Sequence, residues 1–149
     1  MYKHILVPTD GSPLSLKAVK AAAELARGMK ARITALHVIP HYSPPIVGDA
    51  TINFARIVSP AQYRTSTEKT ARKVLDTVKA EAGARKVKCA TAFVTNDQPW
   101  DAIVKAAQGK RCDLIVMASH GRRGLKGLLL GSETHKVLTH SKTPVLVCR

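Results

Sequence analysis

Short apolar runs alternate along this chain with longer segments of helical periodicity, and this alternation restricts the possible folds more than any other feature. Parallel strands need long right-handed crossovers, and helices are the usual crossovers. We therefore predict an α/β fold, a single doubly wound domain with helices on both faces of a five-stranded parallel sheet in the strand order 3-2-1-4-5. The apolar runs place the strands at residues 4–8, 32–39, 86–94, 112–118 and 144–148.

The helical segments carry start and stop signals. Ser12 followed by Pro13 is a good N-cap and first-turn pair for the first helix. Residues 40–59 hold three prolines and no sustained period, which predicts a long loop after the second strand. The same signals end the second helix at Gly83, open the third at Asp97 and Pro99, close it near Gly109, and start the fourth at Ser132.

The length of 149 residues suits one domain over residues 1–149 that buries a core without disulfides or metals. Cys89, Cys112 and Cys148 are odd in number and far apart, so we expect small buried thiols in a reducing compartment. The first residues lack a signal-peptide core, and no later run approaches 18 apolar residues. We therefore expect a cytoplasmic protein with no membrane association.

The charge balance predicts an anionic partner, because 24 Lys and Arg oppose 10 Asp and Glu, for a formal net charge of +14. The cations are spread along the whole sequence, however, and in residues 68–88 they alternate with acids as on a solvated helix face. We find no helix-turn-helix pattern, aromatic repeat or basic tail. Nucleic acid is therefore not the partner we expect, although nucleic-acid binding stays open as an alternative.

Three strand ends are candidate ligand sites, because ligands of open α/β sheets bind beyond the carboxyl ends of the strands, where the strand order reverses. They are PTDGS at 8–12, HVIP at 37–40 and the glycine-rich stretch 118–132. Glycines allow close backbone approach, and a helix that begins at Ser132 offers free N–H groups to an anion. The cations Arg122, Arg123 and Lys126 lie between Gly121, Gly124, Gly127 and Gly131 and can pair with phosphate oxygens.

Two simpler interpretations remain open at this point. The glycine-rich stretch can serve only to turn the chain, with its three leucines in the core. Asp10 can act only as a side-chain cap on the turn before the first helix.

Several familiar sites are excluded by their missing motifs. No Gly-Lys-Ser/Thr closes a P-loop and no GxGxxG follows the first strand, which excludes Walker-type ATPases and Rossmann dehydrogenases. There is likewise no GxSxG elbow, no HExxH and no Cys or His pair at metal-ligand spacing. We predict no catalytic residue and no protein-bound metal.

Four separated motifs stand out along the chain, namely ILVPTDGSPLS, ALHVI, CDLIVMASHGRRG and GSETHKVLTHSKTPVLV. Together they resemble the universal stress protein A family, adenine-nucleotide-binding α/β domains, over essentially the full length. Nucleotide-binding members carry Gly-x2-Gly-x9-Gly-Ser/Thr after the fourth strand, and Ala118, Gly121, Gly131 and Ser132 keep that spacing here. The first glycine is Ala118, whose added methyl group either crowds the ribose or is absorbed by a small shift.

The resemblance implies roles for the matching residues. Residues 8–10 would flank the adenosine, and Val38 would meet adenine through its backbone. Residues 118 and 121 would line ribose and phosphate, and main-chain N–H groups of 121 and 131–133 would cradle the phosphates. We expect the side chain of Glu133 to point outward, since its carboxylate competes with phosphate at a helix N-terminus. The predicted nucleotide-binding residues are Pro8, Thr9, Asp10, Val38, Met117, Ala118, His120, Gly121, Arg122, Arg123, Gly131, Ser132 and Glu133.

The resemblance also implies a stress-response protein that binds ATP, ADP or AMP, with Mg²⁺ or Mn²⁺ possible on the phosphates, and that acts as a nucleotide-dependent regulator. The chain offers no recognisable general base or arginine finger, so slow ATP hydrolysis is the most that we expect. An adenylating enzyme of a related fold is an alternative, although SGGxDS and HxGH signatures are missing. The strand at 144–148 would pair with its copy in a homodimer.

Overall fold

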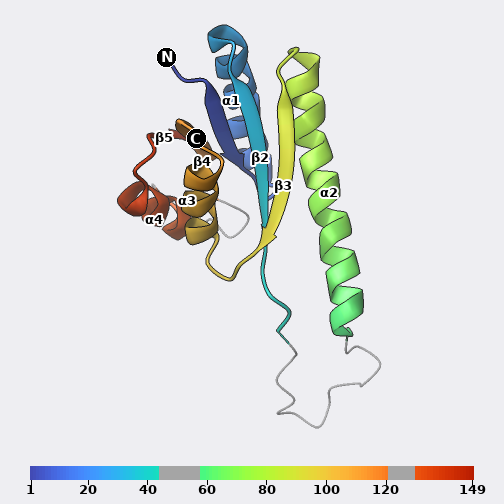
Figure 1. The fold of residues 1–149 in the computed structure, drawn as a ribbon. Coiled ribbons are helices and arrows are strands. Elements are labelled where there is room, and N and C mark those ends of the chain that lie inside the picture. The colour runs from blue at the N-terminus through green and yellow to red at the C-terminus, as the bar shows by residue number, and fades with distance from the viewer. Residues whose placement is uncertain (44–57, 121–129) are drawn as a thin grey trace.

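A computed structural model of the chain describes residues 1–43, 58–120 and 130–149, in which strands and helices alternate as predicted (Figure 1). Within these residues, no helix is both long enough and apolar enough to cross a membrane. The elements are β1 (His4–Pro8), α1 (Pro13–Met29), β2 (Arg32–Ile39), α2 (Pro60–Ala84), β3 (Cys89–Thr95), α3 (Pro99–Gly109), β4 (Leu114–Ala118), α4 (Ser132–His140) and β5 (Val145–Cys148).

The five strands form one parallel sheet in the order β3-β2-β1-β4-β5, which confirms the predicted fold. From β1 the chain moves to one side for β2 and β3, and it then returns to the other side of β1 for β4 and β5. The two central strands β1 and β4 are buried at every residue, as expected where helices cover both faces of a sheet.

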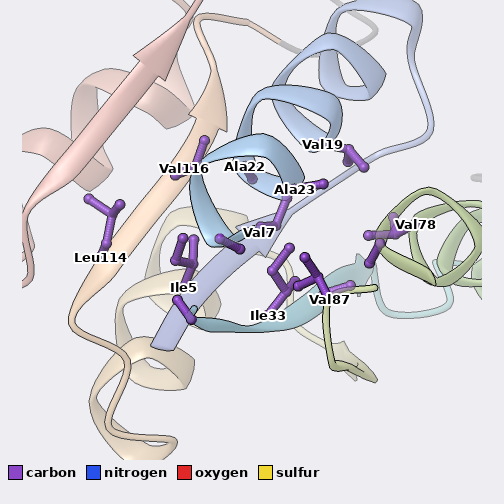
Figure 2. Packing of buried hydrophobic residues seen from close by; sticks show 14 of the residues in the cluster. Ile5, Val7, Val19, Ala22, Ala23, Ile33, Val78, Val87, Leu114 and Val116 are labelled. Carbon is purple, nitrogen blue, oxygen red and sulfur yellow. The ribbon is translucent and has the colours of Figure 1, made fainter. Parts of the chain in front are cut away.

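Each face of the sheet packs against its own pair of helices. One core cluster joins Ile5, Val7 and Ile33 of the sheet to small residues of α1 and to Val78 of α2 (Figure 2). The other cluster joins alternate strand residues, such as Leu6, to α3 and α4. The alternation along each strand thus divides the apolar side chains between two helical layers.

Three helices end in the same way, with a left-handed residue that is not glycine. Lys30, Lys86 and Arg111 have φ values of 54°, 58° and 54°. In each case the next residue donates its N–H to a carbonyl five positions earlier, which is the long bond of a Schellman motif. The donor–acceptor pairs are Ala31–Ala26 at 2.8 Å, Val87–Ala82 at 2.9 Å and Cys112–Ala107 at 2.8 Å.

These caps explain why two strands begin later than predicted. The strand predicted from residue 86 begins at Cys89, because Val87 belongs to the cap of α2. The strand predicted from residue 112 begins at Leu114, because Cys112 belongs to the cap of α3. The strand predicted from residue 144 begins one residue later, and α2 runs one residue past Gly83.

Two further predictions needed correction. Asp97 does not cap α3, whose N-cap is Gln98 without a side-chain hydrogen bond. The Asp97 carboxylate instead accepts from the backbone N–H of His41 at 2.8 Å, and this bond is the main cause of its lowered pKa. Among the cysteines only Cys112 is buried, whereas the other two are partly exposed. Most of the predicted 40–59 loop lies outside the described residues.

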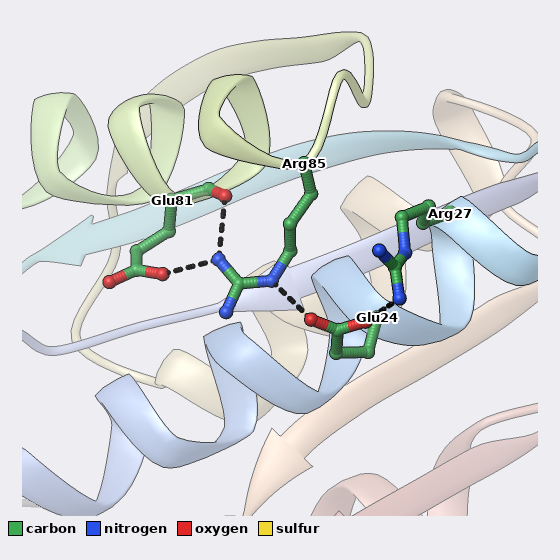
Figure 3. A network of polar contacts seen from close by, with 4 residues as sticks. All are labelled: Glu24, Arg27, Glu81 and Arg85. Carbon is green, nitrogen blue, oxygen red and sulfur yellow. Dashed lines mark hydrogen bonds and ion pairs between the residues drawn. The ribbon is translucent and has the colours of Figure 1, made fainter.

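A polar network ties α1 to α2 on the outside of their layer (Figure 3). Arg85 donates from Nε to Glu24 at 2.7 Å and from Nη1 to Glu81 at 2.7 Å, and Glu24 also pairs with Arg27 at 2.8 Å. The hydrogen bond from Arg85 is the largest cause of the lowered pKa of Glu24. Glu24 and Arg27 are largely exposed and Arg85 and Glu81 partly so, and ion pairs with such access to solvent contribute little to stability.

Candidate functional site

The candidate site lies where the sheet changes its direction of winding, at the carboxyl ends of β1 and β4. These two strands are neighbours, yet the chain leaves them toward opposite faces, since α1 and α4 belong to different layers. A crevice between diverging loops at such a position is the usual ligand site of an open α/β sheet. The predicted residues that the structure describes all lie at this edge, on β1, β2, β4 and α4 or in the loops that follow the strands.

The loop after β1 is held by its own polar side chains. The N–H of Thr9 donates to the Leu36 carbonyl at 2.9 Å, which extends the β1–β2 pairing by one bond. Gly11 has φ 77°, a value that favours glycine, and the N–H of Ser12 donates to Oδ1 of Asp10 at 3.0 Å. The Asp10 carboxylate thus caps the turn before α1.

The same loop is tied to the first helix and to β2. The hydroxyls of Thr9 and Ser15 lie 3.0 Å apart in the interior, where Ser12 also caps α1 by accepting from the Ser15 N–H at 3.2 Å. Nδ1 of His37 donates to the Thr9 carbonyl at 2.8 Å. These bonds fix the main chain around Pro8 and Thr9 independently of any ligand.

The end of β2 presents main-chain groups toward this site. In a parallel ladder, successive residues direct their N–H and C=O to alternate sides. The Leu36 carbonyl bonds toward β1, whereas the Ile39 carbonyl accepts from Asn96 beyond β3 at 2.9 Å. Val38 therefore faces the β1 side, where the pairing has already ended at Pro8 and Leu36. Its main-chain groups point into the space beyond the end of β1.

The end of β4 is joined to the start of α4 by two hydrogen bonds. Oγ1 of Thr134, a residue only 2% exposed, donates to the Ala118 carbonyl at 3.0 Å. The N–H of Gly131 donates to the Ser119 carbonyl at 2.7 Å. Sequence periodicity gave no signal for Thr134 or Ser119, because their partners lie more than ten residues away in the chain.

Gly131 occupies a position where a side chain does not fit. A Cβ atom there would lie 3.0 Å from Cβ of His120, 3.1 Å from its Cα and 3.3 Å from the Ser119 carbonyl oxygen. Glycine at position 131 thus has a packing cause, namely the close passage of the α4 N-terminus over the end of β4. Nδ1 of His120 lies 3.1 Å from Oγ of buried Ser119, which orients its ring.

The N-terminus of α4 is open to an anion. Gly131 is its N-cap and provides no side-chain bond, and Ser132 at the first helical position is exposed. The first N–H groups of a helix have no partner within it and carry partial positive charge. Phosphate and carboxylate groups bind readily at such ends.

The side chain of Glu133 is 38% exposed and has two hydrogen-bond partners. Its Oε2 accepts from the backbone N–H of Trp100 at 2.9 Å, and its Oε1 accepts from Nζ of Lys136 at 3.3 Å. Glu133 thus caps the first turn of α3, which has no side-chain cap of its own from Gln98. Its carboxylate is engaged by the neighbouring helix, while its backbone N–H stays in the first turn of α4.

Ala118 and Met117 are buried at the end of β4, at 8% and 6% exposure. Ala118 does not have a positive φ, so the backbone at this position has no need of glycine. The predicted residues Gly121, Arg122 and Arg123 lie outside the described residues. In the described part of the chain, no group of three or more His, Cys, Asp or Glu side chains could hold a metal ion.

Comparison with known proteins identifies the family to which this chain belongs. The model of the universal stress protein family matches residues 1–149. Universal stress protein YxiE of Bacillus subtilis (strain 168) is 34% identical over 149 residues, which cover 100% of both chains. Universal stress protein MJ0577 of Methanocaldococcus jannaschii is 32% identical over 159 residues, which cover 100% of this chain and 96% of the relative.

Solved structures agree over the same length. The structure of MJ0577 matches with a TM-score of 0.80 and 30% identity, over 99% of this chain and 96% of that chain. A universal stress protein solved in complex with cAMP matches with a TM-score of 0.72 and 25% identity, over 99% of this chain and 97% of that one. The chain is thus similar to these proteins from end to end.

Proposed function

This chain belongs to the universal stress protein family, and on that premise we propose that residues 1–149 form a domain that binds an adenine nucleotide: ATP, ADP or AMP. The observation that carries the proposal is the convergence of three strand ends and one open helix N-terminus at the switch point of the sheet. The complex of a related universal stress protein with cAMP supports the choice of an adenine nucleotide.

The phosphates would bind at the start of α4. Gly131 brings this helix end against Ser119 and His120, and the Thr134 hydroxyl ties the first turn to the end of β4. Donors that are fixed before binding lose little freedom when the phosphates arrive. The N–H groups of Ser132 and Glu133 would therefore hold phosphate oxygens without help from a charged side chain in the described residues.

The adenosine would lie across the ends of β1 and β2. The main-chain N–H and C=O of Val38 point beyond the end of β1, and they match the alternating donor and acceptor edge of an adenine base. Pro8, Thr9 and Asp10 would border the adenosine from the loop after β1. Met117 and Ala118 would contact the ribose from β4.

The remaining predicted contacts complete the same proposal. Gly121, Arg122 and Arg123 would add main-chain and charged donors to the phosphates, with Mg²⁺ or Mn²⁺ on the phosphate oxygens, and His120 would border them from the end of β4. Nucleotide binding would regulate a stress response rather than serve rapid catalysis. We also propose a homodimer through residues 144–148, because β5 is an edge strand whose Leu146 is 40% exposed.

The first experiment asks whether the protein binds these nucleotides. Freshly purified protein is denatured and any released nucleotide is identified by mass spectrometry, and calorimetric titrations with ATP, ADP and AMP follow. We expect heat of binding from at least one of them. No co-purified nucleotide and no heat at millimolar concentrations would end the proposal.

A charge substitution then tests the place of binding. Ser132→Asp puts a carboxylate at the first position of α4, where a helix tolerates acids well, so the fold should be kept. Two like charges about 4 Å apart near a protein surface repel by about 4 kcal/mol, so nucleotide affinity should fall at least about tenfold. Ser66→Asp on the exposed side of α2 adds the same charge as a control. Equal affinities of the two variants would contradict the phosphate site.

A further inference from the structure

A cation-rich feature lies at the opposite edge of the sheet from the proposed nucleotide site. A hollow of about 470 Å³ is lined by residues at the amino ends of β1, β2 and β3. The C-cap residue of α3 closes its border. Its lining residues are His4, Arg32, Ile33, Thr34, Lys88, Cys89, Ala90 and Lys110.

A buried relay holds one cation of this hollow in place. Nη2 of Arg32 donates to Nδ1 of His4 at 3.2 Å, and a guanidinium has no acceptor, so this imidazole nitrogen carries no proton. The proton of the neutral ring is then on Nε2, which donates to Oγ1 of Thr34 at 2.8 Å. His4 and Thr34 are only 7% and 4% exposed, so the relay is rigid and Arg32 is oriented before any ligand arrives.

The protonation state of the relay follows from its surroundings. Burial is the first cause of the lowered pKa of His4 and the charge of Arg32 the second, opposed by Asp113 and by the carbonyls of Lys110 and Arg111. The imidazole is therefore neutral at neutral pH and can accept from Arg32. The Arg32 guanidinium keeps its other N–H groups for a ligand, because one bond to an imidazole uses one of five.

The charge at this edge is unbalanced. Among the described residues, Arg32, Lys88 and Lys110 make no ion pair, and no Asp or Glu lines the hollow. Asp113 is nearby, but its carboxylate accepts from the backbone N–H groups of Lys3 at 2.8 Å and His4 at 2.9 Å. The helix caps add further exposed cations at the same edge, namely Lys30, Lys86 and Arg111.

We propose that this hollow is a second anion site, which binds a phosphate-bearing small molecule at the amino edge of the sheet through Arg32, Lys88 and Lys110. Arg32 lies in β2, Lys88 just before β3 and Lys110 at the C-cap of α3, so three separate segments of the chain bring their cations to one hollow. A tetrahedral phosphate can accept from all of them, whereas a planar carboxylate accepts mainly in one plane. The site does not depend on the proposed nucleotide function, because it shares no residue with the carboxyl edge.

Inorganic tripolyphosphate is a suitable probe, since it carries phosphate charge without a base or sugar. We would titrate it into the full-length ¹⁵N-labelled protein and follow the amide signals of Ile33 and Cys89. These signals should shift in a saturable way. Arg32→Gln should weaken binding by about tenfold, the loss expected for one charge-assisted hydrogen bond. Lys88→Gln/Lys110→Gln should weaken it at least as much.

Two controls make the result decisive. Lys17→Gln/Lys20→Gln removes the same charge as the double variant from the exposed side of α1, and should change the affinity less than about twofold. Citrate should bind more weakly than tripolyphosphate. No shift of the amino-edge signals, an unchanged affinity of Arg32→Gln, an equal loss in the α1 control, or equal binding of citrate would each overturn the proposal. Signals of Ser132 and Glu133 report the nucleotide site separately, so either site can fail alone.

Discussion

Replacing Gly131 by alanine tests whether close packing, and not backbone strain, requires glycine at the start of α4. Gly131 has φ −72° and ψ 155°, which any residue adopts, so the new methyl group adds no strain to the backbone itself. The methyl group would lie 3.0 Å and 3.1 Å from Cβ and Cα of His120 and 3.3 Å from the Ser119 carbonyl oxygen. None of these atoms is the end of a flexible side chain, so the helix start has to move.

The expected magnitude follows from two opposing effects. Forcing an extra methyl group into a filled space costs about 1–3 kcal/mol. Alanine restricts the unfolded chain more than glycine does, which returns about 0.4–1 kcal/mol of stability. Gly131→Ala should therefore lower the free energy of unfolding by about 1–2 kcal/mol. For a chain of this size, each kcal/mol lost lowers the melting temperature by about 2–4 °C.

Urea denaturation at one fixed protein concentration measures this change, and Gly28→Ala is a matched control. Gly28 lies in α1 with no atom within 4 Å of an added Cβ, so alanine there should stabilise the protein by about 0.5–1 kcal/mol. The same substitution should thus move stability in opposite directions at the two glycines. An equal gain at both positions would refute the packing explanation. The displaced helix start in Gly131→Ala should also weaken nucleotide binding in the calorimetric titration.

Two other predictions test the interior directly. Thr134→Val leaves the buried carbonyl of Ala118 without its hydroxyl partner and should cost about 1–3 kcal/mol in urea denaturation, whereas Thr134→Ser keeps the hydroxyl and should recover much of the loss. Equal stability of the valine and serine variants would argue against this bond. Burial raises the pKa of Cys112 to about 11, so at pH 8 its thiol should be the slowest of the three to react with Ellman's reagent, and its rate should rise steeply toward pH 11. Peptide mapping identifies the labelled residue, and rapid labelling of Cys112 at pH 8 would contradict the assignment.

The order of strands and helices was predictable from the sequence, because short apolar runs, continuous in the buried strands β1 and β4, alternate with segments of helical periodicity. The starts of β3 and β4 were not predictable. Val87 and Cys112 are apolar like strand residues, but they cap the ends of the preceding helices. Nothing in the local sequence separates these two uses of a buried apolar residue. A lysine or arginine in the left-handed conformation does not mark a helix end in the sequence either, because glycine usually occupies that position.

The sequence likewise predicted some features of the candidate site and not others. Its location followed from topology, and the turn formed by Asp10 followed from local residue types. The bond between Glu133 and the N–H of Trp100 was not predicted, because the two residues lie 33 positions apart and meet only when α3 packs on α4. Thr134 was missed for the same reason, since its acceptor lies 16 residues earlier at the end of β4.

Because of the three Schellman caps, the connections at the two edges of the sheet should differ in how well they tolerate insertions and deletions. Each cap turns a helix end into a strand start within a few residues, so the connection has a fixed length and sets which side chains enter each face. A single inserted residue there would reverse the faces of the following strand, because the side chains of a strand alternate. The connections at the carboxyl edge carry no such cap in the described residues. Insertions and deletions should therefore be tolerated mainly at the edge that holds the proposed nucleotide site, where loops can diversify while the sheet stays the same.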